Sequence, residues 1–356
     1  MPLLPSALEI IVGILLLFGG GELFVGGSVA ISLLLGIPQI VIGLTVVSLG
    51  TSAPELFVSL LATFQDNDGI AVTNIVGSNI FNVLVVLGLS ALVMPLQVKS
   101  RLVRRDVPLL LAVSMAVWGM ASAGRLTWQA GLALLTALVI NVVWEARTAS
   151  EDPDEADAIE LDERSSTPVA LAKLAIGLVL LVLGSQVLVK GAVAAAAILD
   201  IPQNVVGLTI VAAGTSMPEL VTSLVAAYRG KADLAIGNVV GSNLLNQLVI
   251  LGLCATFSGE GLAVDATVIS RDFPIMVATT LACLPIFWSG GVIKRSEGLV
   301  LVLLYLLYLG EQVLQEISTG MVVDQFRLVV LVVIVPLVLV FLVWQVLSWR
   351  RQRHLI

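Results

Sequence analysis

Two six-residue segments of the chain combine a proline, a carboxylate and hydroxyl groups in the same order. They read GTSAPE at 50–55 and GTSMPE at 214–219, each near the middle of an apolar run. Proline has no N–H, so a helix through these segments would leave the carbonyls of Gly50 and Gly214 without their partners. A free carbonyl inside a membrane is costly unless another group satisfies it. A cation is one such group, and further oxygens stand beside it on Thr51, Ser52, Thr215 and Ser216.

The glutamates that end these segments, Glu55 and Glu219, point to the same chemistry. A carboxylate at mid-membrane costs at least ~2.5–3.5 kcal/mol, and two that lie close together repel each other. Either one of them is protonated or a cation lies between them. Two carboxylates with neutral oxygens suit Ca²⁺, which accepts ~6–8 oxygen ligands, and also Na⁺. Cys254 and Cys283 lie in apolar runs and the only histidine is His354, which argues against Zn²⁺, Cu⁺ or a histidine-based catalytic triad.

A second pair of polar segments follows one apolar run later in each half of the chain. The segments read NIVGSNIFN at 74–82 and NVVGSNLLN at 238–246. In both, a serine and an asparagine stand four residues apart, which places them on one face of a helix. We therefore expect a polar lining formed by Ser78, Asn82, Ser242 and Asn246.

These pairs belong to an internal repeat. Residues 37–88 match residues 201–252 at a constant offset of 164, and RDVP at 105–108 matches RDFP at 271–274. Five apolar spans separate the copies, so the copies cross the membrane in opposite orientations. Inverted repeats are typical of secondary transporters, whose binding site lies near the midplane where the halves meet. The alternative, a duplication without transport, would leave the repeated polar residues without a use.

The composition determines the class of fold. Hydrophobic residues make up 58% of the 356 residues and charged residues only 12%, which excludes soluble enzymes, nucleic-acid binders and secreted scaffolds. A membrane span needs about 20 apolar residues, and the alternating strands of a barrel are not seen. We predict an all-α polytopic membrane protein with two inverted five-helix repeats, a ten-helix core, and an eleventh C-terminal helix. The expected spans are 7–35, 39–63, 70–94, 107–122, 127–146, 169–196, 203–228, 233–257, 273–290, 297–313 and 327–348.

The basic residues orient these spans. With the N-terminus outside, fourteen of the 18 Lys and Arg residues fall in inner loops, as the positive-inside rule requires. We therefore expect a cytoplasmic C-terminus and a plasma or inner membrane location. The long acidic segment between the fifth and sixth expected spans is typical of a solvated linker. It lacks the central glycine of an EF-hand calcium loop. The expected domains are a first repeat at 1–148, this cytoplasmic linker at 149–168, a second repeat at 169–313, and an extra helix with a basic tail at 314–356.

The paired motifs resemble the two α-repeats of the sodium/calcium exchangers, which belong to the calcium/cation antiporter superfamily. The resemblance covers the first ten spans and implies alternating access, with spans one and six sliding as a gate. It implies that Ca²⁺ is held by the glutamates and by backbone oxygens of the motif threonines, which are Glu55, Glu219, Thr51 and Thr215. It also implies sodium sites built with Ser52, Ser216, Ser78, Ser242, Asn82 and Asn246, and backbone oxygens from Ser48 and Ala212.

One position departs from part of the superfamily. Some relatives carry Asp in place of Asn246, and potassium dependence is associated with an acid there, whereas this chain has Asn at both 82 and 246. Proton-coupled calcium exchangers of the superfamily usually carry GN-A-x-E rather than GTSxPE in the first motif. We therefore expect electrogenic, K⁺-independent exchange of Na⁺ for Ca²⁺, with both ions as transported substrates and no cofactor.

Three other functions are weighed against this one. A Ca²⁺/H⁺ antiporter on the same scaffold would use Glu55 or Glu219 to carry a proton. A cation channel commonly assembles its pore from several subunits, whereas here one chain makes a complete site. An intramembrane enzyme is least favoured, because no Ser/His or Asp/Asp pair appears in the spans. The expected partners are Ca²⁺, Na⁺ and the lipid bilayer; at a net charge of -7 nucleic acid is not expected, nor is an obligate protein partner.

Overall fold

The computed structural model describes residues 3–148, 166–199, 212–288, 290–318 and 320–353. Within these ranges the chain is helical apart from four two-residue strands and the connecting turns. The prediction of an all-α membrane fold is therefore confirmed. Most of the expected acidic linker, 149–165, lies outside the described residues, and so does 200–211 at the start of the second motif's span.

The first half of the chain forms helices that are interrupted at the polar motifs. Short π-helical turns, labelled η, lie within these helices, as π-bulges commonly do at functional sites. The elements are α1 (Leu3–Leu35), α2 (Gln39–Ile42), η1 (Gly43–Val47), α3 (Ser48–Thr51), α4 (Ala53–Phe64), α5 (Asp68–Phe81), η2 (Asn82–Leu87), α6 (Gly88–Val93), β1 (Leu96–Gln97), η3 (Leu102–Asp106), α7 (Val107–Ala121), β2 (Arg125–Leu126) and α8 (Trp128–Thr148).

The second half follows the same order of elements and then adds a C-terminal helix. Its elements are α9 (Thr167–Ile198), α11 (Ala212–Thr215), α12 (Met217–Tyr228), α13 (Ala232–Leu245), η7 (Asn246–Leu251), α14 (Gly252–Phe257), β3 (Leu262–Ala263), η8 (Val268–Asp272), α15 (Phe273–Trp288), β4 (Val292–Ile293), α16 (Arg295–Ile317), α17 (Gly320–Val329), η9 (Val330–Ile334) and α18 (Val335–Arg353).

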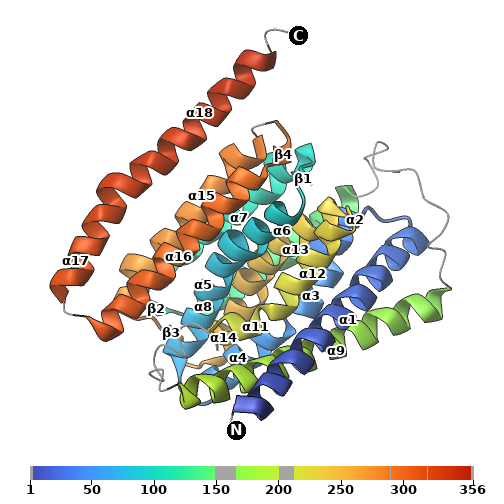
Figure 1. The fold of residues 1–356 in the computed structure, drawn as a ribbon, viewed down its shortest axis with the longest axis horizontal. Helices are drawn as coiled ribbons and strands as arrows, with labels where there is room; N and C mark the ends of the chain where they lie inside the picture. Colours follow the sequence, from blue (N-terminus) through green and yellow to red (C-terminus); the bar gives the residue numbers. More distant parts are fainter. Residues whose placement is uncertain (1–2, 149–165, 200–211, 289, 319, 354–356) are drawn as a thin grey trace.

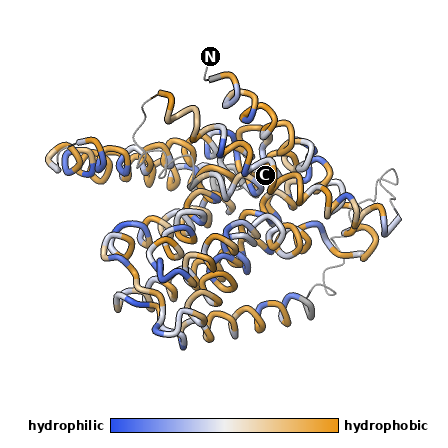
Figure 2. The backbone as a smooth tube through the Cα atoms, turned by 90° about the horizontal axis from the view of Figure 1, so that it is seen from below, coloured by the Kyte–Doolittle hydropathy of each residue, from blue (hydrophilic) through white to orange (hydrophobic). Residues whose placement is uncertain are grey.

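The helices agree with the expected membrane spans. Eight helices of the described ranges are long and apolar enough to cross a membrane, and the pair Gln39–Thr51 and Ala53–Phe64, bent by 48°, makes a ninth. Apolar residues, drawn in orange, dominate these helices in Figure 2. The span expected at 107–122 is α7. Of the span expected at 203–228, the structure describes 212–228. Each of the eleven expected spans thus has a helical counterpart in the described chain.

Two small strand pairs make the inverted repeat visible. Strand β1 pairs antiparallel with β4, and β2 pairs antiparallel with β3. In chain order β1 and β3 follow the third span of each half, while β2 and β4 follow the fourth, so one pair is the repeat-related copy of the other. Figure 1 shows β1 with β4 at one end of the bundle and β2 with β3 at the other. The two halves are therefore joined at both ends of the bundle by equivalent backbone hydrogen bonds.

Helices α1 and α9 pack against each other along most of their length (Figure 1). A side chain at Gly20 would come within 2.8 Å of the Leu181 backbone, and one at Gly184 within 2.8 Å of the Leu17 backbone. Such glycines recur every seven residues on both helices, which lets the two backbones approach closely. The contacts pair rising numbers on α1 with falling numbers on α9, so the helices run antiparallel. The glycines are Gly13, Gly20 and Gly27 on α1, and Gly177, Gly184 and Gly191 on α9.

The C-terminal helix α17–α18 lies along the outside of the bundle, next to α15 and α16 (Figure 1). Only 6% of its most apolar 18-residue stretch is buried within the protein, so nearly all of this surface is available to lipid. One polar contact fixes its start, because Arg327 Nε lies 2.8 Å from Glu311 Oε1 on α16. The helix is thus an addition to the ten-helix core rather than part of it.

Candidate cation-binding site

Both glutamate motifs interrupt their helices in the same way. Helix α3 ends at Thr51 and α4 starts at Ala53, with Ser52 between them at φ −80° and ψ 7°. In the second half α11 ends at Thr215, and Ser216 precedes α12 at φ −90° and ψ 10°. The motif proline occupies the first turn of the new helix, where its missing N–H costs nothing. Each glutamate therefore lies in the first turn of a helix, whose positive end stabilises a carboxylate.

The break brings the two motifs together in a reciprocal arrangement. Ser52 Oγ donates a hydrogen bond of 2.9 Å to Glu219 Oε1, and Ser216 Oγ donates one of 2.7 Å to Glu55 Oε1. Both glutamates are fully buried. Ser78 joins them, since its Oγ lies 3.1 Å from Ser216 Oγ and 3.5 Å from Glu55 Oε1. Residues 161 or 167 positions apart in sequence thus form one cluster, which we call the central site.

Several oxygens of the central site are left without a hydrogen-bond donor. Each glutamate uses one carboxylate oxygen for its serine, while the other is buried and unpaired among the described residues. Such oxygens are costly to bury unless something binds them, and a cation satisfies them. The buried, unpaired oxygens also include atoms from the second polar segment of each half. The unpaired oxygens are Glu55 Oε2, Glu219 Oε2, Asn82 Oδ1, Asn246 Oδ1 and Ser242 Oγ.

Four asparagines cross-link the two halves beside the glutamates. Asn82 Nδ2 donates to Asn243 Oδ1, and Asn246 Nδ2 donates to Asn79 Oδ1, both at 3.0 Å. Asn79 and Asn243 in turn donate to each other's backbone carbonyl, at 3.4 and 3.1 Å. These bonds use the amide nitrogens of Asn82 and Asn246 and leave their oxygens free for a cation. Asn79 and Asn243 were not among the site residues predicted from the sequence, although their place in the repeated GSN element was a usable signal.

The motif threonine and the serine before it are held against α13. Thr51 Oγ1 donates to Asn238 Oδ1 at 3.1 Å, and Asn238 Nδ2 donates to Ser223 Oγ at 2.9 Å. Ser48 Oγ lies 2.5 Å from the carbonyl of Gly43 and 3.1 Å from that of Asn238. The side chains of Ser48 and Thr51 are therefore used for hydrogen bonds, and the Ser48 carbonyl itself accepts the N–H of Ser52 at 3.0 Å. Asn238 was not singled out from the sequence either, although it opens the repeated segment NVVGSN.

The matching positions of the second half are only partly described. Thr215 is the last residue of α11 and is half-buried beside Ser216. Ala212 is the first residue of α11, and the structure describes its backbone only. The preceding segment, 200–211, lies outside the described residues. The structure thus brings both glutamates into contact with Ser52, Ser216 and Ser78, and it places Asn82 and Asn246 in the bonds that join the two halves. Ser242 is buried on α13 with its hydroxyl unpaired, and Thr215 and Ala212 lie on the short helix that leads into Ser216.

The oxygen atoms of the central site are ligands that suit a hard cation. Within the described ranges neither glutamate has a Lys or Arg partner in an ion pair. No group of three or more His, Cys, Asp or Glu side chains occurs in that part of the chain either. The site therefore offers two carboxylates, hydroxyls, amide oxygens and the carbonyl ends of α3 and α11, whose dipoles favour a cation. Oxygen-only ligands of this kind suit Ca²⁺ and Na⁺ and not the softer transition metals.

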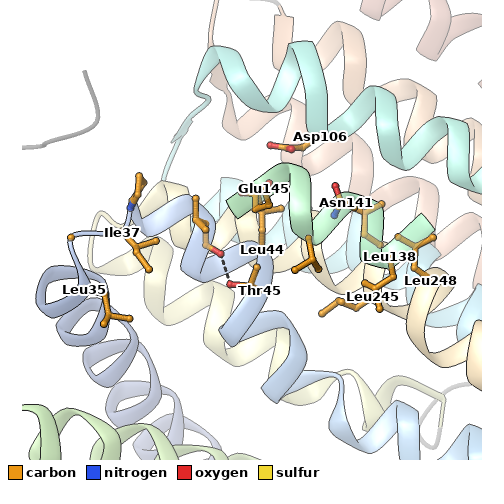
Figure 3. A pocket seen from close by; sticks show the side chains of 15 residues that line it. Leu35, Ile37, Leu44, Thr45, Asp106, Leu138, Asn141, Glu145, Leu245 and Leu248 are labelled. Carbon is orange, nitrogen blue, oxygen red and sulfur yellow. Dashed lines mark hydrogen bonds between the residues drawn. The ribbon is translucent and has the colours of Figure 1, made fainter. Parts of the chain in front are cut away.

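A separate pocket of about 620 Å³ opens between α2, α8 and η7 (Figure 3). Its walls are mainly apolar, and its polar side chains include Asp106, Asn141 and Glu145. The two acids already have cationic partners, since Glu145 pairs with Arg101 and Arg105 and Asp106 lies 3.6 Å from Arg101. The pocket contains none of the central-site residues, so it is separate from the central site.

The intramembrane acid of the first span also lies away from the central site. Glu22 on α1 forms an ion pair with Arg229, at the end of α12. Both side chains are partly exposed, at 45% and 33%. Glu22 therefore accepts a hydrogen bond, with the Arg229 guanidinium as the donor.

An inverted helical repeat with buried, unpaired oxygens at its centre defines a polytopic membrane protein that exchanges cations. The chain belongs to the sodium/calcium exchanger protein family, whose sequence pattern matches residues 6–146 and 169–314. The resemblance stated from the motifs is therefore confirmed. The match ends before α17, in agreement with the C-terminal helix as an addition to the core.

Individual relatives agree with this assignment. The sodium/calcium exchanger MaX1 of Methanosarcina acetivorans is 33% identical over 340 residues, which cover 85% of this chain and 97% of MaX1. The inner membrane protein YrbG of Escherichia coli is 35% identical over 294 residues, 80% of this chain and 89% of YrbG. The solved structure of the sodium-calcium exchanger NCX_Mj superimposes with a TM-score of 0.75 at 30% identity, over 87% of this chain and 99% of that one.

Proposed function

We propose that the chain is an electrogenic, K⁺-independent antiporter that exchanges Na⁺ for Ca²⁺ by alternating access. The observation that carries the proposal is the reciprocal pair of Ser–Glu hydrogen bonds between the two halves. It fixes two carboxylates side by side, each with one oxygen left for a cation. Two fixed negative charges match one Ca²⁺, and the surrounding neutral oxygens suit Na⁺ as well. The relatives MaX1 and NCX_Mj, both named as sodium/calcium exchangers, support this pair of ions.

Competition for the same oxygens couples the two ions. Glu55 and Glu219 cannot bind Ca²⁺ and a full set of Na⁺ ions together, because both use the same carboxylate oxygens. Binding of one ion set on one side of the membrane therefore favours release of the other set. The two ions move in opposite directions when the site opens to one side at a time. If more than two Na⁺ replace one Ca²⁺, each cycle moves net charge, which makes the exchange electrogenic.

Potassium independence follows from the two neutral asparagines. Asn82 and Asn246 add oxygens without adding charge, and their amide nitrogens are fixed by Asn243 and Asn79. The central site thus keeps the two negative charges of its glutamates and has no third carboxylate to balance an additional K⁺. This argument supports Na⁺ and Ca²⁺ as sufficient substrates.

Exchange of Ca²⁺ for H⁺ is the alternative on the same scaffold. The unpaired Oε2 atoms of Glu55 and Glu219 are buried, and each can take a proton in place of a cation. Such an exchanger would be driven by a proton gradient in the absence of Na⁺. The GTSxPE form of both motifs favours sodium, and the flux experiment below separates the two couplings.

We further propose a plasma or inner membrane location with the N-terminus outside and the C-terminus in the cytoplasm. The excess of Lys and Arg in the expected inner loops supports this orientation. The name of the relative YrbG, an inner membrane protein, supports the location. Protease access to a tag at the C-terminus in inside-out and right-side-out vesicles tests the orientation, and protection in inside-out vesicles would contradict it.

The proposed function is tested with purified protein in proteoliposomes loaded with Na⁺, at equal pH on both sides and without K⁺. We expect Ca²⁺ uptake that requires the outward Na⁺ gradient and that responds to an imposed membrane voltage. Uptake that needs a proton gradient instead would establish Ca²⁺/H⁺ exchange. Uptake that appears only when K⁺ is added would contradict potassium independence, and single-channel currents would favour a channel.

A further inference from the structure

Ser185 on α9 reaches the second glutamate motif from outside it. Its side chain is 5% exposed, and its Oγ donates a hydrogen bond to the backbone carbonyl of Gly214. This is the carbonyl that loses its helical partner because Pro218 has no N–H. Gly214 is buried and directly precedes Thr215, at the end of α11. The hydroxyl of Ser185 therefore takes the place of the missing backbone donor at the break in the helix.

The first half of the chain has no hydroxyl donor at the position that matches Ser185. The residue that matches Ser185 at the offset of 164 is Gly21, which has no hydroxyl. A side chain at Gly21 would meet Val221 of α12 at 3.0 Å, so the position is used for close packing. The carbonyl of Gly50, which matches Gly214, accepts a backbone N–H at the end of α3. The bond from Ser185 therefore breaks the symmetry of the two motifs.

The donor lies on one member of the closely packed α1–α9 pair. Gly184, the neighbour of Ser185, lies so close to α1 that a side chain there would meet the Leu17 backbone at 2.8 Å. This contact fixes the rotation of α9 about its axis, and its position along that axis, near Ser185. The position of α9 therefore controls whether the hydroxyl reaches the carbonyl of Gly214. A shift by the length of one hydrogen bond would leave that carbonyl buried and unpaired, which is costly in a site closed to water.

We propose that Ser185 is a positioning residue for cation binding, which acts through the carbonyls of the second motif. By holding the carbonyl of Gly214, it leaves the next carbonyl, that of Thr215, directed at the cation. The inference rests on the proposed function, because Thr215 is assigned to the cation there. It also means that α9 acts on the second motif through a hydroxyl contact for which α1 has no counterpart at the first motif.

The test compares three variants of the full-length protein. Ser185→Ala removes the hydroxyl, and Ser185→Thr keeps it. Ser28→Ala is the matched control, because Ser28 is also buried but donates within its own helix, to the carbonyl of Phe24 at 2.8 Å. Equilibrium binding of radioactive Ca²⁺ to purified protein, with Na⁺ as the competitor, measures both affinities. Sodium-driven Ca²⁺ uptake in proteoliposomes measures the maximal rate.

We expect Ser185→Ala to weaken Ca²⁺ binding about three- to tenfold, the usual range for one hydrogen bond between membrane helices. The maximal rate of uptake should change less than the affinity, because the variant keeps the two carboxylates that bind the cation. Ser185→Thr should restore most of the affinity, and Ser28→Ala should bind as the wild type does. This pattern separates positioning from a general loss of stability, which would affect both serines alike.

Two results would overturn the inference. One is a Ca²⁺ affinity of Ser185→Ala equal to that of the wild type. The other is an equal loss in Ser28→Ala, which would reduce the effect to packing. A wild-type protein that binds neither Ca²⁺ nor Na⁺ would instead contradict the proposed function, and the inference with it. The wild-type binding curve therefore tells the two failures apart.

Discussion

Ser52 lies 2.9 Å from Glu219, although the two residues belong to opposite halves of the chain and are 167 positions apart. The mirrored bond, from Ser216 to Glu55, is 2.7 Å long. Each carboxylate thus receives its nearest donor from the other repeat. The central site exists only where the two halves meet, and its charge depends on both glutamates.

Replacing either glutamate should abolish exchange. Glu55→Gln and Glu219→Gln keep the shape of the side chain and remove one of the two charges that hold Ca²⁺. We expect sodium-driven Ca²⁺ uptake to fall by about a hundredfold or more, because a lost charge-assisted contact in a buried site costs roughly 3 kcal/mol. Glu260→Gln is the control, since that side chain is 89% exposed and pairs with Arg125 only at the surface. Uptake that survives in either buried variant would refute the assignment.

The two motif serines should differ in their effects. The side chain of Ser216 contacts both Glu55 and Ser78, whereas in the described part of the chain the side chain of Ser52 bonds to Glu219 alone. We expect Ser216→Ala to lower the apparent affinity for Na⁺ more than Ser52→Ala does, with effects toward the upper and the lower end, respectively, of a range of about three- to tenfold. The measurement is the Na⁺ concentration that half-inhibits Ca²⁺ binding. Equal effects would show that the contact with Ser78 adds nothing.

An acid at the second asparagine should make transport sensitive to pH. Asn246 donates from Nδ2 to Asn79 Oδ1, and an ionised aspartate has no hydrogen to donate. Asn246→Asp must therefore bind a proton to keep this bond, or lose it and gain a third negative charge. We expect Ca²⁺ uptake by the variant to change between acidic and neutral pH more than uptake by the wild type. Asn82→Asp, its repeat-related partner, should behave alike, and identical pH profiles for variants and wild type would contradict the network.

The close packing of α1 and α9 should depend on single glycines. A side chain at Gly20 would meet the Leu181 backbone at 2.8 Å, whereas nothing described lies within 4 Å of one at Gly19. We expect Gly20→Ala to destabilise the protein by about 1–3 kcal/mol, as overpacking does, and to lower the thermal unfolding midpoint in detergent. Gly19→Ala adds the same methyl group next door and should leave the midpoint unchanged. A similar midpoint for both variants would argue against tight packing.

Two glutamates that form ion pairs, one on α8 and one on α16, should contribute unequally to stability. Glu145 is buried among Arg101 and Arg105, while Glu311 pairs with Arg327, which is 42% exposed on the added helix. Glu145→Gln removes one of the two acids beside these buried arginines and leaves Asp106 as the other, so we expect a loss of roughly 3 kcal/mol. Glu311→Gln disrupts a partly exposed pair and should cost about 1 kcal/mol or less. The thermal unfolding midpoints of the two variants measure these losses. A larger loss for Glu311→Gln than for Glu145→Gln would show that the added helix depends on its ion pair.

The repeat made much of the fold predictable. A constant offset and an odd number of intervening spans predicted two inverted halves and two glutamates meeting between them, and the Ser–Glu bonds agree with that expectation. Helix boundaries were predictable at Pro54 and Pro218, because proline cannot continue the preceding turns. The strand pairs β1–β4 and β2–β3 were not, since two-residue strands carry no periodicity to detect.

The contacts that depend on three-dimensional placement were beyond the sequence. Glu22 forms an ion pair with Arg229 at a separation of 207 residues, and no local sequence pattern predicts such a pair. The roles of Asn79 and Asn238 were also missed, because only serine and the later asparagine were weighed for the helix face. Ser185 was invisible for another reason, since its partner is a backbone carbonyl and the repeat offers Gly21 in its place.

Both Ser–Glu bonds join one repeat to the other, which has a consequence for how such a chain could have evolved. A single repeat could not hold a cation alone, because Glu55 takes its serine from the other half. An ancestral half-chain would have worked only as an antiparallel pair, with copies inserted into the membrane both ways and with basic residues balanced between its ends. In the present chain each copy has one fixed orientation, so matched positions are free to differ. Ser185 opposite Gly21, and Glu22 opposite Gln186, are traces of that freedom.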